Sequence, residues 1–145
     1  GTDYDQANGT NVRSTGRNWS KQSWGITSKS KEVDTLLWKN QQLNNVHEMH
    51  PELCFWALNN KKEMTYSKKK LEGFEERVNA LSTYYCQSRA IIDQSLTNYR
   101  RKDVAKDDVL DALVGAVTAR NSQPLKTIPV TPEFDLEGIK MGIVY

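Results

Sequence analysis

From residue 107 the chain reads Asp107-Asp108-Val109-Leu110-Asp111-Ala112-Leu113-Val114-Gly115-Ala116-Val117-Thr118-Ala119-Arg120. Its spacing of apolar residues predicts a long helix over about residues 103–120. On that helix, positions 108, 111, 112, 115, 116 and 119 share one face, which carries two carboxylates followed only by alanine and glycine. Small residues let a helix lie close to its neighbour. We therefore expect this face to pack against the core and to hold both carboxylates firmly.

The three aspartates of this helix differ in how they can be explained. Asp107 and Asp108 lie in the first turn, where the helix dipole favours negative charge. Asp111 leads into the small-residue face, and a buried carboxylate costs several kcal/mol unless a cation or hydrogen-bond donors balance it. A divalent metal ion shared by Asp108 and Asp111 would meet that need. Ligands that are all oxygens favour Mg²⁺ or Mn²⁺ over zinc.

A second acidic motif is Glu48-Met49-His50-Pro51-Glu52. In an extended backbone, Glu48 and His50 lie on one face of the strand because side chains alternate. A carboxylate at the end of a strand is a common functional position in α/β proteins. The alternative is a solvated glutamate on an edge strand beside a surface histidine. If Glu48 lies opposite Asp108 and Asp111, the three form a two-metal phosphoryl-transfer arrangement.

Composition limits the class of protein without naming a partner. The 145 residues include 20 Lys and Arg against 18 Asp and Glu, a net charge of +2. No apolar run reaches the ~20 residues that cross a bilayer, and no signal peptide opens the chain. Cys54 and Cys86 lack a metal or redox spacing and are interpreted as reduced thiols of a cytoplasmic protein, with a disulfide as the alternative.

The remaining pattern predicts a mostly helical chain with one or two short strands. Residues 1–18 are polar and predict a loop, and Ser20 caps a helix that extends to about Asn40. The other expected elements are a short strand over 46–50, a helical turn over 53–58, a turn over 59–62, a helix capped by Ser67, a helix over 83–99, and an irregular tail over 121–145 with a terminal strand at 141–145. Such a helical layer with so few strands predicts an incomplete α/β domain.

Basic residues and tryptophans are further candidates for binding sites. Lysines and arginines cluster around 61–70 and 100–106, which favours a solvated surface or contact with a phosphate backbone. The four tryptophans, Trp19, Trp24, Trp38 and Trp56, are interpreted as core or interface anchors. A zinc site built from His47, His50 and Cys54 is disfavoured because the two histidines alternate along the strand.

Several motifs occur together in one order and resemble a known family. They are Ser20-Lys21-Gln22-Ser23-Trp24 with Glu32-Val33-Asp34, Glu48 to Phe55, Lys68 with Gly73 and Arg77, Asp107 to Ala112, and the ending Gly138 to Tyr145. This order resembles a family of uncharacterised proteins described as predicted nucleases with an RNase H-like fold. The segment Asp108-x-x-Asp111-Ala112-Leu113 also resembles the last catalytic helix of Holliday-junction resolvases, which share that superfold.

The resemblance implies a set of site residues. Glu48, Asp108 and Asp111 become the inferred catalytic residues and ligands of Mg²⁺ or Mn²⁺, with Asp107 as a substitute for either aspartate. His50, Glu52, Lys68 and Arg77 match the pattern as supporting residues without assigned roles. The implied activity is metal-dependent phosphodiester hydrolysis, and the implied partner is nucleic acid.

The chain departs from the family at one point. The family's first-strand carboxylate, in a Gly-x-Asp-Gly-like motif, has no counterpart here, since Asp3 and Asp5 lie in polar sequence. We therefore expect residues 1–145 to be a single partial RNase H-like domain, its C-terminal portion, which is inactive alone. An upstream half, a second polypeptide or a second copy would complete it. The alternatives are a non-catalytic interaction or nucleic-acid-binding module of the same fold, and another phosphoryl-transfer enzyme of the superfold.

Overall fold

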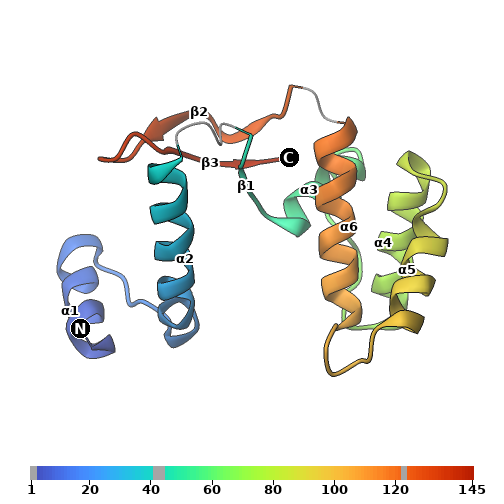
Figure 1. The fold of residues 1–145 in the computed structure, drawn as a ribbon, viewed down its shortest axis with the longest axis horizontal. Coiled ribbons are helices and arrows are strands. Elements are labelled where there is room, and N and C mark those ends of the chain that lie inside the picture. Colours follow the sequence, from blue (N-terminus) through green and yellow to red (C-terminus); the bar gives the residue numbers. More distant parts are fainter. Residues whose placement is uncertain (1–2, 41–44, 122–123) are drawn as a thin grey trace. The chain divides into compact units, whose positions relative to one another are not determined.

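A computed structural model describes residues 3–40, 45–121 and 124–145 of the protein (Figure 1). The chain divides into two compact units, Gly1–Asn45 and Val46–Tyr145, where the sequence predicted one partial domain. The sequence Asn44-Asn45 predicts a turn, which lies partly outside the described residues. Each unit is considered by itself.

The first unit begins with helix α1 (Tyr4–Thr15), in a region that the sequence analysis predicted to be a loop. That prediction was wrong because the helix is defined by its ends and not by an apolar stripe. The Asp3 side chain accepts a hydrogen bond from the backbone N–H of Gln6, and Gly16 ends the helix with a φ of 71°. No residue of α1 is buried, so its sequence lacks the helical spacing of apolar residues that would have predicted it.

Helix α2 (Lys21–Lys39) follows the prediction closely. The Ser20 hydroxyl accepts from the N–H of Ser23, and Asn40 forms the C-cap. The two helices meet through aromatic rings, since the Trp24 ring lies 6.3 Å from Tyr4 and 5.8 Å from Trp19, both in edge-to-face contact. None of the four tryptophans belongs to the buried core of the described chain, which corrects the core half of their interpretation.

The second unit is a helical layer against a small sheet. Its helices are α3 (Pro51–Leu58), α4 (Leu71–Tyr84), α5 (Ser88–Asn98) and α6 (Lys106–Asn121). Ser67 does not cap α4, whose N-cap is Lys70, because residues 68–70 form a turn before the helix begins. Helices α4 and α6 begin at the end of the bundle where α5 finishes, the lower end in Figure 1.

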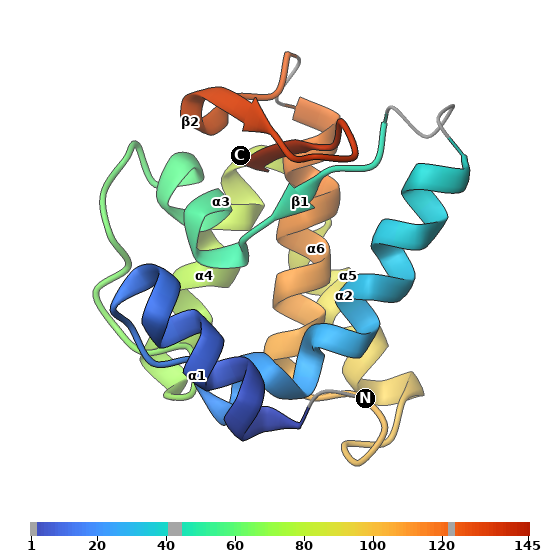
Figure 2. The same ribbon diagram turned by 90° about the vertical axis from the view of Figure 1, so that its left-hand side faces the viewer.

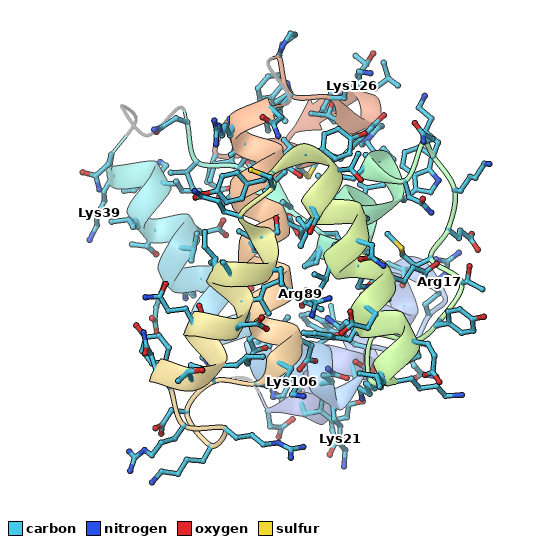
Figure 3. All side chains as sticks on the ribbon, turned by 90° about the vertical axis from the view of Figure 1, so that its right-hand side faces the viewer. Arg17, Lys21, Lys39, Arg89, Lys106 and Lys126 are labelled. Atoms are coloured by element: carbon cyan, nitrogen blue, oxygen red, sulfur yellow. The ribbon has the colours of Figure 1, made fainter. Side chains whose placement is uncertain are left out.

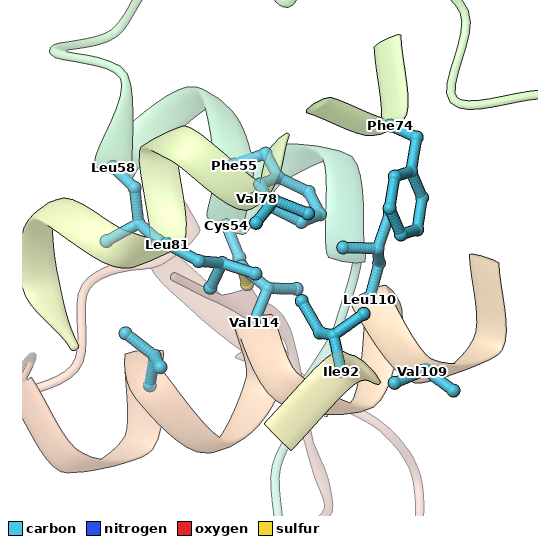
Figure 4. Packing of buried hydrophobic residues seen from close by; sticks show 11 residues of the cluster. Cys54, Phe55, Leu58, Phe74, Val78, Leu81, Ile92, Val109, Leu110 and Val114 are labelled. Atoms are coloured by element: carbon cyan, nitrogen blue, oxygen red, sulfur yellow. The ribbon is translucent and has the colours of Figure 1, made fainter. Parts of the chain in front are cut away.

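The hydrophobic core lies where α6 packs against α3, α4 and α5 (Figure 4). Its fully buried members come from all four helices, which makes α6 the central element of the unit. They include Cys54, Phe55, Val78, Leu81, Ile92, Leu110 and Val114.

The buried face of α6 is not the face that the sequence analysis selected. Val109, Leu110, Val114, Val117 and Thr118 are its buried residues. The positions of the predicted packing face, 108, 112, 116 and 119, are exposed, and 111 and 115 are half-buried. Valine and leucine remove more apolar area from water than alanine or glycine do, so the larger side chains direct the helix toward the core.

The small residues still serve one contact. A Cβ atom on Gly115 would collide with the terminal methyl of Met49, so β1 approaches α6 at this glycine (Figure 2). Close approach therefore occurs at one position and not along the whole stripe.

The sheet has three strands in the order β1-β3-β2, namely β1 (Glu48–Met49), β3 (Lys140–Val144) and β2 (Thr127–Phe134). Strand β1 pairs parallel with β3, with Glu48 opposite Ile143, and β2 pairs antiparallel with β3. The unit is therefore α/β with a mixed sheet, mostly helical as predicted, and the expected terminal strand is present. The RNase H-like topology lies beyond what three strands define.

Strand β2 replaces most of the irregular tail that was expected after residue 121. Its prolines, Pro129 and Pro132, argued against a strand because proline cannot donate to a ladder. The strand tolerates them because it forms an edge of the sheet, and its pairing shifts register between Ile128 and Glu133. Sequence reasoning had no way to identify β2 as an edge.

Two further expectations concern the whole chain. Both cysteines are free thiols, Cys54 buried and Cys86 exposed, as predicted. Among the described residues, no helix combines the length and apolarity needed to span a bilayer.

Gly73 provides a test of the packing around α4. A Cβ atom there would collide with the Ser67 carbonyl and lie 2.7 Å from the Tyr66 oxygen, both backbone atoms. We expect Gly73→Ala to lower the free energy of unfolding by about 1–3 kcal/mol, as overpacking does. Urea denaturation followed by circular dichroism measures this.

Gly115→Ala is the matched control, because the atom it meets is the end of the flexible Met49 side chain. Alanine gains up to about 1 kcal/mol of helix propensity over glycine, so this variant should stay close to wild type. Equal losses of unfolding free energy in both variants would show that the backbone of Tyr66 and Ser67 is not tightly packed against Gly73.

Candidate functional site

The central contact of the site joins Lys68, just before α4, to Asp111 on α6. The Lys68 Nζ donates to the Asp111 Oδ2 at 2.6 Å. Each side chain is 25 % exposed, so the ion pair is partly shielded from water. Such shielding strengthens the attraction relative to a fully exposed pair. The predicted metal ligand Asp111 is therefore bound to the predicted supporting residue Lys68.

The second oxygen of Asp111 is in a different position. Oδ1 is buried and accepts no hydrogen bond from the described residues. A buried carboxylate oxygen without a partner carries a desolvation cost. It can be relieved by a donor or by a divalent cation, and this oxygen fits one coordination position of such an ion.

The neighbouring aspartates do not join Asp111. The Asp108 side chain is exposed, and its Oδ2 accepts from the backbone N–H of Ala105 at 3.2 Å, which caps the start of α6. Asp107 is half-buried and forms no hydrogen bond or ion pair within the described part of the chain. The structure thus gives Asp108 the helix-terminus role that the sequence analysis considered as its alternative.

Glu48 and His50 lie at the other acidic motif and are both exposed. Throughout residues 3–40, 45–121 and 124–145, no three His, Cys, Asp or Glu side chains form a group suited to a metal ion. The three-ligand set of Glu48, Asp108 and Asp111 does not fit as a preformed site in these residues, although Asp111 fits as one ligand. The predicted use of Mg²⁺ or Mn²⁺ stays a prediction.

The two remaining supporting residues pair with each other. Arg77 Nη2 donates to Glu52 Oε2 at 2.7 Å and its Nε donates to Oε1 at 3.2 Å, a bidentate arrangement. The Arg77 side chain is 4 % exposed and the Glu52 side chain 40 %. The Arg77 guanidinium also lies 5.6 Å from the centre of the Phe55 ring. The role of this pair is to join α4 to α3.

Helix α4 also holds the segment 65–68 that precedes it. Arg77 Nη1 donates to the carbonyl oxygens of Tyr66 and Gly73, each at 2.9 Å. The adjacent Glu76 carboxylate accepts from the N–H groups of Thr65 and Tyr66, at 2.8 and 3.1 Å. Partial burial acts to raise the pKa of Glu76, but these N–H donors outweigh it and lower the pKa below its ordinary value. The position of Lys68 follows from these bonds.

Several basic residues lie around the end of the bundle where α4 and α6 begin. Lys106, labelled in Figure 3, is the first residue of α6, and its Nζ lies 5.7 Å from the centre of the Phe74 ring in the first turn of α4. The side chains of Lys69, Lys70, Arg101 and Lys102 form no ion pair with described residues. We name these four the basic end. Arg100 is paired with Asp103 and is not part of it.

Within the described ranges, Cys54 belongs to no group of three His, Cys, Asp or Glu side chains suited to a metal ion. It is buried beneath the sheet, its Sγ lies 3.9 Å from the carbonyl oxygen of Val144, and burial raises the pKa of its thiol. A raised pKa keeps the thiol protonated and unreactive. The expectation that His47, His50 and Cys54 hold no zinc stays a prediction.

Sequence reasoning missed Glu76 and the ion pair of Glu75 with Arg89. The signal for Glu76 was its spacing, since Gly73, Glu76 and Arg77 recur at three and four residues and share one face of a helix. The sequence could not predict what this face contacts, because its partners are backbone atoms of a loop.

The second unit defines an α/β protein with a mixed three-stranded sheet, a helical layer and a partly buried ion pair of Lys68 with Asp111. A family described as "Protein of unknown function (DUF429)" matches residues 1–133, and the chain belongs to this family. No curated protein and no solved structure matches the chain.

The importance of Arg77 can be measured. We expect Arg77→Met to lower the free energy of unfolding by about 3 kcal/mol, because it leaves Glu52 and two backbone carbonyls without their donor. Arg89→Met is the control, since Arg89 forms an ion pair with Glu75 at the surface. The Arg89 side chain is 43 % exposed and the Glu75 side chain 39 %. An exposed pair contributes up to about 1 kcal/mol. Urea denaturation measures both variants. Equal losses of unfolding free energy would contradict the structural role that we assign to Arg77.

Proposed function

We propose that this chain contributes to metal-assisted hydrolysis of phosphodiester bonds, in an RNase H-like domain, with Asp111 as its ligand for Mg²⁺ or Mn²⁺. One observation carries the proposal, namely that Asp111 presents a buried Oδ1 without a donor among the described residues. The resemblance of its sequence to the predicted nucleases supports the same residue. A bound divalent ion would polarise a phosphoryl oxygen and lower the pKa of a water molecule.

The residues around Asp111 would supply binding and charge. Lys68 holds Oδ2 and thereby leaves Oδ1 as the oxygen directed to a cation. Its ammonium group also places a positive charge where a phosphate oxygen can be attracted. Because Glu48 and Asp108 do not gather with Asp111 in the described residues, we expect the isolated chain not to cleave nucleic acid.

Binding of Mn²⁺ tests this proposal. Wild-type protein should bind Mn²⁺ in an electron paramagnetic resonance titration, and Asp111→Asn should weaken binding about tenfold or more, since a charged ligand is lost. Asp93→Asn removes the same charge from an exposed site on α5 and should bind as wild type does. Equal binding by both variants would rule out Asp111 as a ligand.

Cleavage of plasmid DNA and of RNA in Mg²⁺ completes the test. No cleavage is expected from the 145-residue chain. Cleavage that Asp111→Asn abolishes would contradict our view that these residues alone leave the site incomplete.

A second candidate is a nucleic-acid-binding module without catalysis. It is favoured by the Lys68 ammonium, which already balances the charge of Asp111, and by the unpaired side chains of the basic end. Phosphate contacts by Lys and Arg supply most of the sequence-independent affinity for nucleic acid.

The salt dependence of binding tests this candidate. Replacing Lys69, Lys70, Arg101 and Lys102 by glutamine should weaken binding of a labelled DNA duplex. It should also reduce the slope of log affinity against log salt by up to about 3–4, if each residue contacts one phosphate. Replacing Arg13, Lys29, Lys31 and Lys39 in the first unit removes equal charge. Equal effects of the two sets in fluorescence anisotropy would indicate attraction by bulk charge alone.

A further inference from the structure

A shallow pocket of about 550 Å³ lies in the second unit, away from the Lys68–Asp111 pair. Helix α3, the segment before α4 and strand β2 all contribute to it. Its lining residues are Glu52, Leu53, Trp56, Glu63, Met64 and Ile128. None of the residues discussed as metal ligands or as the basic end lines this pocket. It therefore calls for a separate explanation.

Two carboxylates line the pocket, and one of them lacks an ion-pair partner among the described residues. Glu52 is balanced by Arg77, which binds both of its oxygens, although 40 % of the Glu52 side chain is still exposed. Glu63 is exposed and forms no hydrogen bond or ion pair within the described part of the chain. The uncompensated charge is thus that of Glu63, with Glu52 as an additional acceptor beside it.

Trp56 supplies an aromatic surface that already attracts a cation. The Lys61 ammonium lies 5.9 Å from the centre of its ring. The ring is held in edge-to-face contact with Tyr145, with centres 5.7 Å apart. Indole is the strongest partner for cations among aromatic side chains. A second cation in the pocket would share this ring and would be repelled by Lys61.

The rest of the lining is apolar. Leu53 and Met64 are half-buried, and Ile128 is 46 % exposed. Pockets that combine an apolar wall with a few placed polar groups bind small molecules whose polar group is at one end. Here the polar groups are acidic and aromatic, so the matching group on the ligand is a cation.

We propose that this pocket binds an organic cation, an alkylammonium or alkylguanidinium group on an apolar stem. The charged group lies between the Glu63 carboxylate and the Trp56 ring, and the stem contacts Leu53, Met64 and Ile128. The same chemistry is carried by a free amine and by the side chain of an arginine or lysine in a peptide. This inference does not depend on the proposed hydrolytic function.

Titration with n-butylguanidinium tests the proposal in the full chain. Nuclear magnetic resonance follows the indole N–H of Trp56, identified by its loss in Trp56→Phe. We expect a saturable shift in wild type and about tenfold weaker binding in Glu63→Gln, because the charged contact is lost. Glu137→Gln is the matched control, since Glu137 is exposed and does not line the pocket.

Lys61 gives a variant with the opposite effect. Lys61→Gln removes the cation that now lies over the Trp56 ring, so n-butylguanidinium should bind more tightly than to wild type. Lys61, Glu63 and Glu137 are exposed, so their substitution leaves the core intact.

Three results would overturn the proposal. They are an unchanged Trp56 signal, equal binding by wild type and Glu63→Gln, and an equal shift produced by n-butanol, which has the stem without the charge. Nα-acetyl-arginine methylamide identifies the source of the cation. Tighter binding of this compound than of n-butylguanidinium indicates a peptide side chain, and weaker binding indicates a small organic cation that is free in solution.

Discussion

Arg77 connects three parts of the second unit at once. Its guanidinium binds Glu52 on α3, the Gly73 carbonyl on its own helix and the Tyr66 carbonyl in the preceding segment. A guanidinium with five donors in a rigid plane can serve all these acceptors, which an ammonium group cannot do with the same geometry. The Arg77 side chain is almost fully buried. Without its hydrogen bonds, the buried polar atoms around it would lower the stability of the fold.

The position of the segment 59–70 follows from this constraint. Gly73 permits that segment to approach the helix closely, Glu76 binds its N–H groups, and Arg77 binds its carbonyl. One end of the segment then presents Lys68 to Asp111, and the other presents Glu63 and Met64 to the pocket beside Trp56. One face of α4 thus binds the segment that contributes residues to both proposed sites, although the chemistry of the two sites is different.

The two sites also differ in how their charge is balanced. At Asp111 a lysine balances one oxygen and leaves the other buried, so the cation that we propose there would have a restricted position. At Glu63 the carboxylate faces water and attracts a cation without geometric selection, and the aromatic and apolar wall supplies the selection instead. A metal ion suits the first arrangement, and an organic cation suits the second.

Local sequence was sufficient for features that depend on neighbouring residues. The cap at Ser20, the short strand within residues 46–50, the terminal strand at 141–145 and the helical character of α6 all follow from short-range spacing and turn chemistry. The membership of Glu52, Lys68, Arg77 and Asp111 in one motif order was also visible in the sequence.

Only the tertiary structure decided how these residues are paired and which surfaces are buried. It directed α6 to the core by its valines and leucine, made β2 an edge strand that accepts prolines, and joined Lys68 to Asp111 over a sequence separation of 43. These outcomes depend on the total apolar area buried and on contacts between distant segments, whereas spacing along the chain reports only what lies within a turn or a strand.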